Sequence, residues 1–223
     1  MILETLEVQP LVFKVPRIIE DAEADYVIQR AMPEFFNSGV AHQTKDIGKS
    51  ADTWRTSEQM WLPPDAAPLR IIYNRVGLLV RVPPVHFEAM QVLRYLEGQK
   101  YSAHLDSFDL SAYEGNDQMY RMTKGGAKQR LATAFMYMST VRTGGWTVFP
   151  RAGGAPQPYD FEDCSKGLRA EPVKGKMSLF YNLLPNGAID HYSLHGGCKP
   201  LVNPDGTPAD TKFSANLWVS NMP

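Results

Sequence analysis

The 223-residue chain lacks several features that define large classes of proteins. No apolar run reaches about 18 residues, so the sequence predicts no membrane-spanning helix. The formal net charge is −1, which leaves no electrostatic footprint for a nucleic-acid backbone or an anionic membrane. Residues 1–16 lack a basic segment followed by an apolar core, so no signal peptide is visible.

Cysteine is also scarce, because Cys164 and Cys198 are the only two thiols. Two thiols cannot complete a four-ligand zinc site. They are either unpaired or joined in one disulfide, and a disulfide would indicate an oxidising compartment. These two residues alone leave that choice open.

The chain does contain enough apolar residues, 43%, for a hydrophobic core in one large domain or two small ones. Acidic residues in the first turn and a proline at 33 predict a helix at 20–32, and periodicity predicts a second helix at 67–80. From residue 85 onward, runs of period two predict strands at 89–96, 100–106, 130–139, 176–183 and 213–219. Helices followed by many short strands predict a mainly β (α+β) fold, a jelly roll or barrel with N-terminal helices packed on it.

Two polar segments are predicted to be loops. Residues 41–53 contain Gly48 and are expected to form a mobile loop. Residues 107–129 are longer, and a loop of that length inside a compact domain is usually functional or disordered. Because this segment directly follows the predicted strand 100–106, it is a candidate lid.

His104 and Asp106 are two residues apart in the predicted strand 100–106. Positions i and i+2 of a strand point to the same face, so an imidazole and a carboxylate can converge on one metal ion. One further histidine would complete the 2-His-1-carboxylate triad of non-haem Fe(II) oxygenases. The pattern alone is weak, since His86 and Glu88 have the same spacing.

The further histidine is His191 or His195. We favour His195, whose small neighbours leave room for a metal complex, whereas His191 lies in a polar stretch and is expected to be exposed. An Fe(II) oxygenase also needs an electron-donating co-substrate such as 2-oxoglutarate, whose distal carboxylate requires a basic partner. Lys212 fits that role, although a solvated lysine at a strand edge explains it equally well in isolation.

Several motifs resemble those of one known family and occur in its order. They are Arg55-Thr-Ser57, Gln91-Val-Leu-Arg-Tyr95, Gly98-Gln-Lys-Tyr101, His104-Leu-Asp106, Gln129-Arg-Leu-Ala-Thr133, Gly144-Gly-Trp-Thr-Val-Phe-Pro150, Ser193-Leu-His195, and Lys212 with Trp218. Over residues 50–220 the chain resembles the plant and algal prolyl 4-hydroxylases of the Fe(II)/2-oxoglutarate dioxygenase superfamily. Chance does not easily supply so many motifs in sequence order.

The resemblance implies a single domain, 1–223, with a double-stranded β-helix (jelly roll, cupin-like) core and flanking helices. It implies that the iron ligands are His104, Asp106 and His195. It implies that the residues contacting 2-oxoglutarate are Tyr95, Thr147 and Lys212. The peptide-groove residues that it implies are Arg55, Ser57, Glu88, Tyr101, Arg130 and Trp218.

The implied reaction is hydroxylation of peptidyl proline at C4. It would use Fe(II), 2-oxoglutarate and O2, with ascorbate rescuing iron that oxidises without substrate. The partner would be a proline-rich peptide, which is already extended as a polyproline II helix. We expect a monomer that contacts neither nucleic acid nor a membrane.

Three departures from the family pattern are visible. Trp146 stands where the family usually has a glutamate near the 2-oxoglutarate pocket, which puts the role of Thr147 in doubt. Residues 203–209 are additional chain and predict a lengthened hairpin tip. Ser220 stands where the family often has a histidine, which would alter the grip on substrate.

The resemblance also implies a Cys164–Cys198 disulfide, as in plant-type members. Such a bond would favour the lumen of the ER or Golgi, with an N-terminal anchor absent from this sequence. Without it, a cytoplasmic location is expected. Two other functions stay open: a 2-oxoglutarate oxygenase acting on a small molecule or another protein residue, and a non-catalytic module that binds proline-rich peptides.

Overall fold

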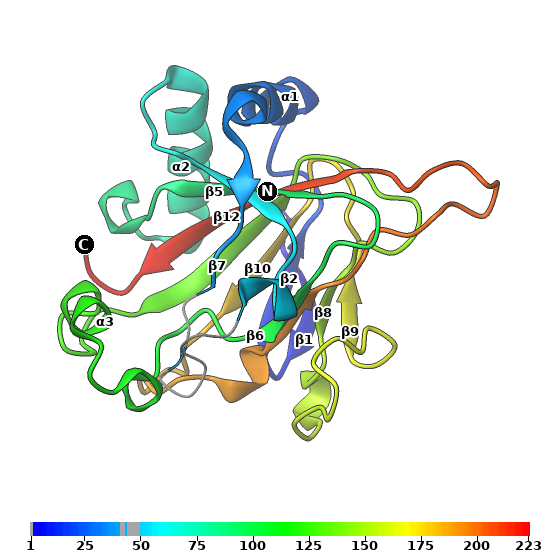
Figure 1. The fold of residues 1–223 in the computed structure, drawn as a ribbon. Helices are drawn as coiled ribbons and strands as arrows, with labels where there is room; N and C mark the ends of the chain where they lie inside the picture. Colours follow the sequence, from blue (N-terminus) through cyan, green and yellow to red (C-terminus); the bar gives the residue numbers. More distant parts are fainter. Residues whose placement is uncertain (1, 41–42, 44–49) are drawn as a thin grey trace.

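The computed structural model describes residues 2–40, 43 and 50–223, which form two antiparallel sheets with helices against the larger one (Figure 1). The larger sheet has eight strands, in the spatial order β1 (Glu4–Val8), β2 (Leu11–Val15), β10 (Met177–Tyr181), β7 (Arg130–Tyr137), β12 (Lys212–Ser220), β5 (Met90–Tyr95), β4 (Glu58–Leu62) and β3 (Phe36–Asn37). The smaller sheet has four strands, in the order β6 (Tyr101–His104), β11 (His195–Gly197), β8 (Thr147–Phe149) and β9 (Leu168–Ala170). The predicted mainly β fold is confirmed.

From β5 onward the chain alternates between the two sheets. The larger sheet takes β5, β7, β10 and β12, while the smaller sheet takes β6, β8 with β9, and β11. This winding is that of a jelly roll, and it directs one face of each sheet into a shared interior. The proposed site residues on β6, β11 and β12 are brought together by it.

The two predicted helices are present as α1 (Asp21–Ala31) and α2 (Ala67–Val80). Glu20 caps α1 in a capping box with Glu23, in which each side chain bonds the other's backbone N–H. α2 ends at Arg81, whose left-handed φ of 60° stops the helix. Both helices lie over the larger sheet (Figure 1).

Hydrophobic clusters lie on both faces of the larger sheet. On the outer face, Val27 of α1 and Ile72 of α2 pack in one cluster with Val92 of β5. In the interior, Leu93 of β5 and Phe149 of β8 belong to a second cluster between the sheets. Val92 and Leu93 therefore serve opposite faces, as consecutive residues of a strand must. The central strands are rigidly held from both sides.

All five predicted strands are present, with ends shifted by a few residues. The strand predicted at 100–106 ends at His104, so Asp106 lies just beyond it. The strands not predicted are β1, β2, β3, β4, β8, β9 and β11. Of these, β8, β9 and β11 have three residues each, which is too short for an alternating pattern to be recognised.

One of the two predicted loops can be followed in full in the structure. The candidate lid, 107–129, contains α3 (Asp117–Met122) and is closed at its base where Gln129 donates to the Phe108 carbonyl at 2.6 Å and accepts from its N–H at 2.9 Å. Its action as a lid stays a prediction. The loop predicted at 41–53 falls largely on 41–42 and 44–49, which lie outside the described residues.

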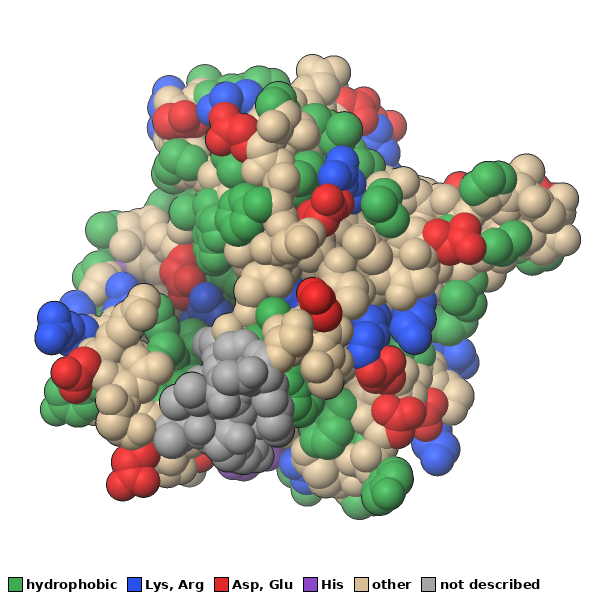
Figure 2. All heavy atoms as spheres, in the orientation of Figure 1, with side chains coloured by type: hydrophobic (Ala, Val, Ile, Leu, Met, Phe, Trp, Pro, Cys, Tyr) green, Lys and Arg blue, Asp and Glu red, His purple; other side chains and the backbone are tan. Residues whose placement is uncertain are grey.

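The predicted lengthened tip at 203–209 lies in an arm between β11 and β12 that projects from the body (Figures 1 and 2). Arg142 ties this arm to the domain, because its guanidinium contacts Asp205 at 3.1 Å and Asp210 at 3.0 Å. On the face shown in Figure 2, basic and acidic side chains are interspersed. None of the described helices is long and apolar enough to cross a membrane.

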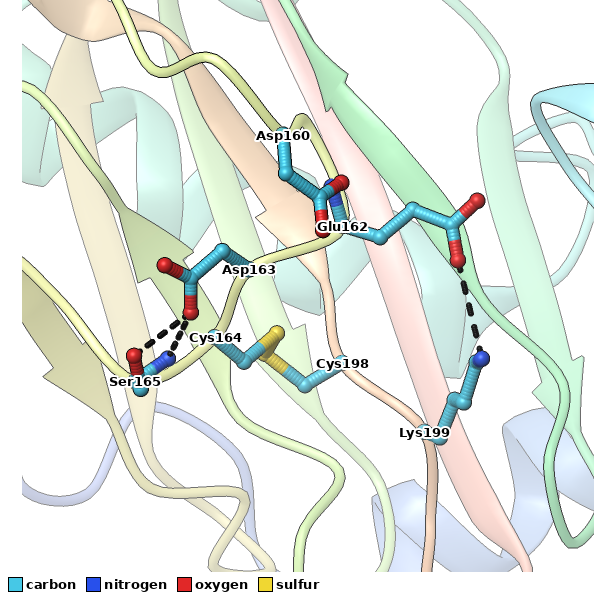
Figure 3. Close-up of a disulfide and its surroundings, with 7 residues drawn as sticks. All are labelled: Asp160, Glu162, Asp163, Cys164, Ser165, Cys198 and Lys199. Carbon is cyan, nitrogen blue, oxygen red and sulfur yellow. Dashed lines mark hydrogen bonds and ion pairs between the residues drawn. A yellow bond between two sulfur atoms is a disulfide. The ribbon is translucent and has the colours of Figure 1, made fainter.

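The predicted Cys164–Cys198 disulfide is confirmed, with 34 residues separating its ends (Figure 3). It fastens the segment 159–164 to Cys198, which directly follows β11 and lies three residues after His195. Beside it, Glu162 contacts Lys199 at 3.5 Å and also pairs with Lys100, which precedes β6. Through the segment 162–164, covalent and ionic contacts therefore join the start of β6 to the end of β11, the two strands that carry the histidines.

Removing the disulfide should destabilise the protein. Closing a loop of this length is worth about 2–4 kcal/mol of unfolding free energy, because the reduced unfolded chain regains freedom. We expect the Cys164→Ser/Cys198→Ser variant to unfold at a lower urea concentration than the wild type, with its unfolding free energy reduced by that amount. Wild-type protein treated with dithiothreitol should match the variant, and an unchanged midpoint after verified reduction would contradict the prediction.

Candidate iron and 2-oxoglutarate site

Three side chains from separate parts of the chain converge in the interior. His104 and His195 are direct cross-strand partners on β6 and β11. Asp106 Oδ1 lies 3.7 Å from His104 Nε2, and Asp106 Oδ2 lies 3.6 Å from His195 Nε2. One ligand atom from each residue lies within 4.8 Å of the others, and no other such group of three occurs in the described part of the chain. The structure thus brings together the three predicted ligands.

Backbone carbonyls orient both imidazole rings in the same way. His104 Nδ1 lies 2.9 Å from the carbonyl of Ser102, and His195 Nδ1 lies 2.9 Å from the carbonyl of Ser193. A carbonyl only accepts, so Nδ1 carries the proton in each ring and Nε2 offers its lone pair to the interior. Burial, together with the neighbouring His195, lowers the pKa of His104 to about 3. His104 is therefore neutral at pH 7, as metal binding requires.

Asp106 supplies the negative charge of the cluster. Burial raises the pKa of this carboxyl, but His195, His104 and Arg130 outweigh that effect and lower it to about 2. Its Oδ2 accepts hydrogen bonds from Thr133 Oγ1 at 2.7 Å and from Trp218 Nε1 at 2.8 Å. Two imidazoles and one carboxylate that converge from one side are the donor set that suits Fe(II) with open coordination positions.

The other described histidines, His86 and His191, are not part of this cluster. His86 lies with its Nδ1 3.3 Å from the Ser220 carbonyl, and Glu88 binds Arg130 instead of a metal ligand. His191 is exposed in a short 3₁₀ turn, as expected. The pair His86 and Glu88 therefore has the spacing of a metal-binding pair but lies outside the metal cluster.

The predicted groove residues form two groups beside the cluster. In the first, the Tyr101 ring stacks on His104 with centroids 3.6 Å apart, and the Arg55 guanidinium lies 4.4 Å from the Tyr101 centroid. Arg55 Nε donates to Ser57 Oγ at 2.9 Å. Its Nη2 is buried and has no hydrogen-bond partner within the described residues. Within the described part of the chain, a guanidinium nitrogen without an acceptor is thus held close to His104.

The second group lies on the Asp106 side. Arg130 binds Glu88 through two hydrogen bonds of 2.7 and 2.8 Å, and its guanidinium lies 3.5 Å from the Trp218 ring centroid. Trp218 is buried and donates to Asp106, so it contacts a predicted iron ligand directly. The sequence motifs had suggested only a groove wall for Trp218.

Lys212 is the most unusual charged residue of the interior. It opens β12 directly opposite Tyr95 of β5 and is 0% exposed. Its Nζ lies 4.9 Å from the Tyr95 ring centroid and 5.4 Å from that of Phe135, and it has no hydrogen-bond partner among the described residues. Burial lowers the pKa of Lys212 to about 7. A buried, unpaired ammonium fits the distal carboxylate of 2-oxoglutarate, which would give it a counter-ion.

Hydroxyl groups surround the same end of the interior. Thr147 Oγ1 accepts from Tyr137 at 2.9 Å, and the Tyr137 hydroxyl also lies 3.2 Å from Ser178 Oγ. Tyr137 and Ser178 were not among the predicted site residues. The signal available in the sequence was the two-residue alternation along β7, which places Tyr137 on the same face as Thr133.

Trp146 does not share the interior with its neighbour Thr147. It lines a pocket of ≈ 180 Å³ with Val148, Phe161 and the disulfide, on the other face of the smaller sheet. The Trp146 side chain therefore lies apart from that of Thr147, and its distance from bound 2-oxoglutarate stays a prediction. The tryptophan leaves the inward hydroxyl of Thr147 undisturbed.

Comparison with known proteins agrees with this geometry. The family model described as the 2OG-Fe(II) oxygenase superfamily, where 2OG is 2-oxoglutarate, matches residues 90–220. The chain belongs to this superfamily. It is 31% identical to prolyl 4-hydroxylase 13 of Arabidopsis thaliana, over 96% of this chain and 72% of that protein. It is 34% identical to probable prolyl 4-hydroxylase 3 of the same plant, over 97% of this chain and 71% of that protein.

Solved structures support the fold. A viral collagen prolyl hydroxylase from Paramecium bursaria Chlorella virus-1, in complex with 2OG, superposes with a TM-score of 0.60, covering 94% of this chain and 95% of that one at 23% identity. A prolyl 4-hydroxylase from Pseudomonas putida gives 0.55 at 15% identity, covering 93% and 91%. The double-stranded β-helix and the predicted family are confirmed, and the chain is an Fe(II)/2OG-dependent dioxygenase.

The buried ammonium of Lys212 predicts a pH-dependent affinity for 2OG. In the ligand-free protein its pKa is about 7, whereas a bound carboxylate favours the charged form. Binding above pH 7 therefore takes up a proton, and affinity should fall by up to about tenfold per pH unit. Calorimetric titration of the Co(II)-loaded protein with 2OG at pH 6–9 measures this slope.

Two controls isolate Lys212 in that titration. 2-Oxobutyrate carries the keto acid without a distal carboxylate, so its affinity should show no such slope. Lys212→Met should bind 2OG at least about thirtyfold more weakly, because it lacks a charged partner for the carboxylate, and with a flat profile. A flat profile in the wild-type protein would contradict the assignment.

Proposed function

We propose that this dioxygenase hydroxylates peptidyl proline at C4 in proline-rich or collagen-like chains. The reaction converts 2OG and O2 to succinate and CO2 and adds one oxygen to proline, with ascorbate maintaining the iron. The observation that carries the proposal is the His104–Asp106–His195 cluster above a buried, unpaired Lys212, in a chain with the Arabidopsis prolyl 4-hydroxylases among its relatives.

In this proposal the metal is held by His104 Nε2, His195 Nε2 and one oxygen of Asp106. Bound iron with 2OG and O2 supplies the oxidative chemistry. The protein supplies orientation: the Ser102 and Ser193 carbonyls fix the rings, and burial of the cluster limits water. Lys212 binds the distal carboxylate of 2OG from the far end of the interior, with Tyr95 and Thr147 beside it.

The peptide would lie between the two groups of groove residues. Arg55, held by Ser57 and Tyr101, offers its free Nη2 to a peptide carbonyl. Arg130 and Glu88 form the opposite wall. A polyproline II chain suits such a site because it needs little ordering, exposes its carbonyls and packs against aromatic rings. Trp218 shapes this wall indirectly, through its contacts with Arg130 and Asp106.

The disulfide supports a proposed location in the lumen of the ER or Golgi, because the cytosol keeps most thiols reduced. A monomeric state, and the absence of nucleic-acid or membrane contact, stay predictions from the sequence.

The test is succinate formation with Fe(II), 2OG and ascorbate, with and without a polyproline or Ser-Pro repeat peptide. We expect peptide-stimulated turnover, with a mass gain of one oxygen on proline. His104→Ala should abolish it, because one iron ligand is lost. His86→Ala, which removes the histidine of the similarly spaced pair, should retain it.

Other outcomes of that assay separate the alternatives. Turnover of 2OG without peptide stimulation would keep the oxygenase but exclude this substrate. Peptide binding without Fe(II) uptake after anaerobic purification would favour the non-catalytic module. Neither result is expected from the geometry of the cluster.

Replacing Arg55 should weaken peptide binding in particular. A hydrogen bond to a charged group is worth about 1.5–3 kcal/mol, so Arg55→Lys, which loses the planar fork, should bind the peptide roughly tenfold or more weakly. Fluorescence anisotropy of a labelled peptide on the Co(II)–2OG protein measures this. Arg70→Ala removes an exposed arginine of α2 and is the matched control. Equal affinity for Arg55→Lys and wild type would contradict the groove assignment.

A further inference from the structure

The buried side-chain amide of Asn182 is connected to the metal cluster. Asn182 follows β10 and is 0% exposed. Its Nδ2 donates to Thr133 Oγ1 at 2.9 Å, and Thr133 Oγ1 donates to Asp106 Oδ2 at 2.7 Å. Neither the sequence motifs nor the groove assignment gave Asn182 or Thr133 a function.

The direction of these bonds is fixed by chemistry. An amide nitrogen can only donate, so Thr133 must accept from Asn182. The hydroxyl has one proton, and that proton is then committed to Asp106. If the amide were turned over, its oxygen would compete for the same proton and Asp106 would lose a donor. Asn182 in this orientation therefore determines that the Thr133 hydroxyl donates its proton to Asp106.

The orientation has a visible cost. Asn182 Oδ1 is buried and has no hydrogen-bond partner among the described residues. Buried unpaired acceptors are rare in folded proteins because they have lost their hydrogen bonds to water. The hydrogen bond from Nδ2 to Thr133 thus holds the amide in an orientation that leaves Oδ1 without a donor among the described residues.

The backbone of Asn182 extends the connection to the second strand of the cluster. Its carbonyl accepts from the Asp190 N–H at 2.9 Å, and the Asp190 carbonyl accepts from Ser193 Oγ at 2.7 Å. The Ser193 carbonyl in turn accepts from His195 Nδ1. Hydrogen bonds that are linked through the covalent structure of residues 182, 190 and 193 thus connect Asp106 to His195.

We propose that Asn182 is a positioning residue for the metal site, acting through Thr133. With Trp218 as the other donor, it keeps Asp106 Oδ2 engaged by protein hydrogen bonds and leaves Oδ1 to bind the metal. The carboxylate then occupies one coordination position, and the positions needed by 2OG and O2 stay open. This proposal rests on the metal role of the cluster proposed above.

The test is Co(II) affinity and the Co(II) absorption spectrum of the full chain. Thr133→Val keeps the shape but removes the hydroxyl, and Asn182→Leu removes the amide donor at similar size. Each should weaken Co(II) binding about 10–100-fold and alter the spectrum, as expected for a group that orients a metal ligand. Thr133→Ser restores the hydroxyl and should bind Co(II) like the wild type.

A double-mutant cycle separates this mechanism from general destabilisation. Because the Asn182 side chain acts through Thr133, the double variant should bind Co(II) no more weakly than Thr133→Val alone. Thr123→Val removes a similarly buried hydroxyl that bonds only local backbone groups, those of α3 and the N–H of Gly126, and it should bind Co(II) like the wild type. Thermal unfolding of each apo variant verifies its fold, and Asn182→Ser replaces Asn182→Leu if the latter does not fold.

The outcomes distinguish the two levels of proposal. Wild-type protein that fails to bind Co(II) would overturn the metal site itself. Wild-type binding together with unchanged affinity in Thr133→Val, or additive losses in the double variant, would overturn only the positioning role of Asn182.

Discussion

The antiparallel pairing of β6 with β11 is the contact on which the whole site depends. It sets His104 directly opposite His195, so the distance between two ligands is fixed by backbone hydrogen bonds and not by flexible side chains. The carbonyls two residues before each histidine then fix the ring orientation. The disulfide and the Glu162 ion pairs fasten the chain around these two short strands, which are too short to be held by pairing alone.

The interior combines charges that would be unfavourable in an ordinary core. Asp106 is a buried carboxylate beside two imidazoles, and Lys212 is a buried amine that has no hydrogen-bond partner among the described residues. Both arrangements are sensible if a dication and a dicarboxylate complete them, since each then neutralises its neighbour. The ligand-free protein therefore stores unfavourable electrostatic energy that binding of the co-substrate relieves.

Much of the site could be predicted because it is encoded in local spacing. The His104–Asp106 spacing, the position of Lys212 and the order of the motifs are all properties of the one-dimensional sequence. Asn182, Tyr137 and Ser178 were missed because each bonds a partner between 10 and 49 residues away, which it meets only in the folded protein. The short strands β8 and β11 were missed because three residues cannot display a period.

The position of β12 has a consequence for how the protein matures. It is the last strand of the chain, yet it lies in the middle of the larger sheet between β7 and β5, and it carries Lys212 and Trp218. Until β12 has been synthesised, β7 and β5 each have one edge whose backbone N–H and C=O groups lack their strand partner. The interior is therefore completed only after β12 has been translated, and a nascent chain held short of residue 212 lacks the strand on which the proposed 2OG site depends.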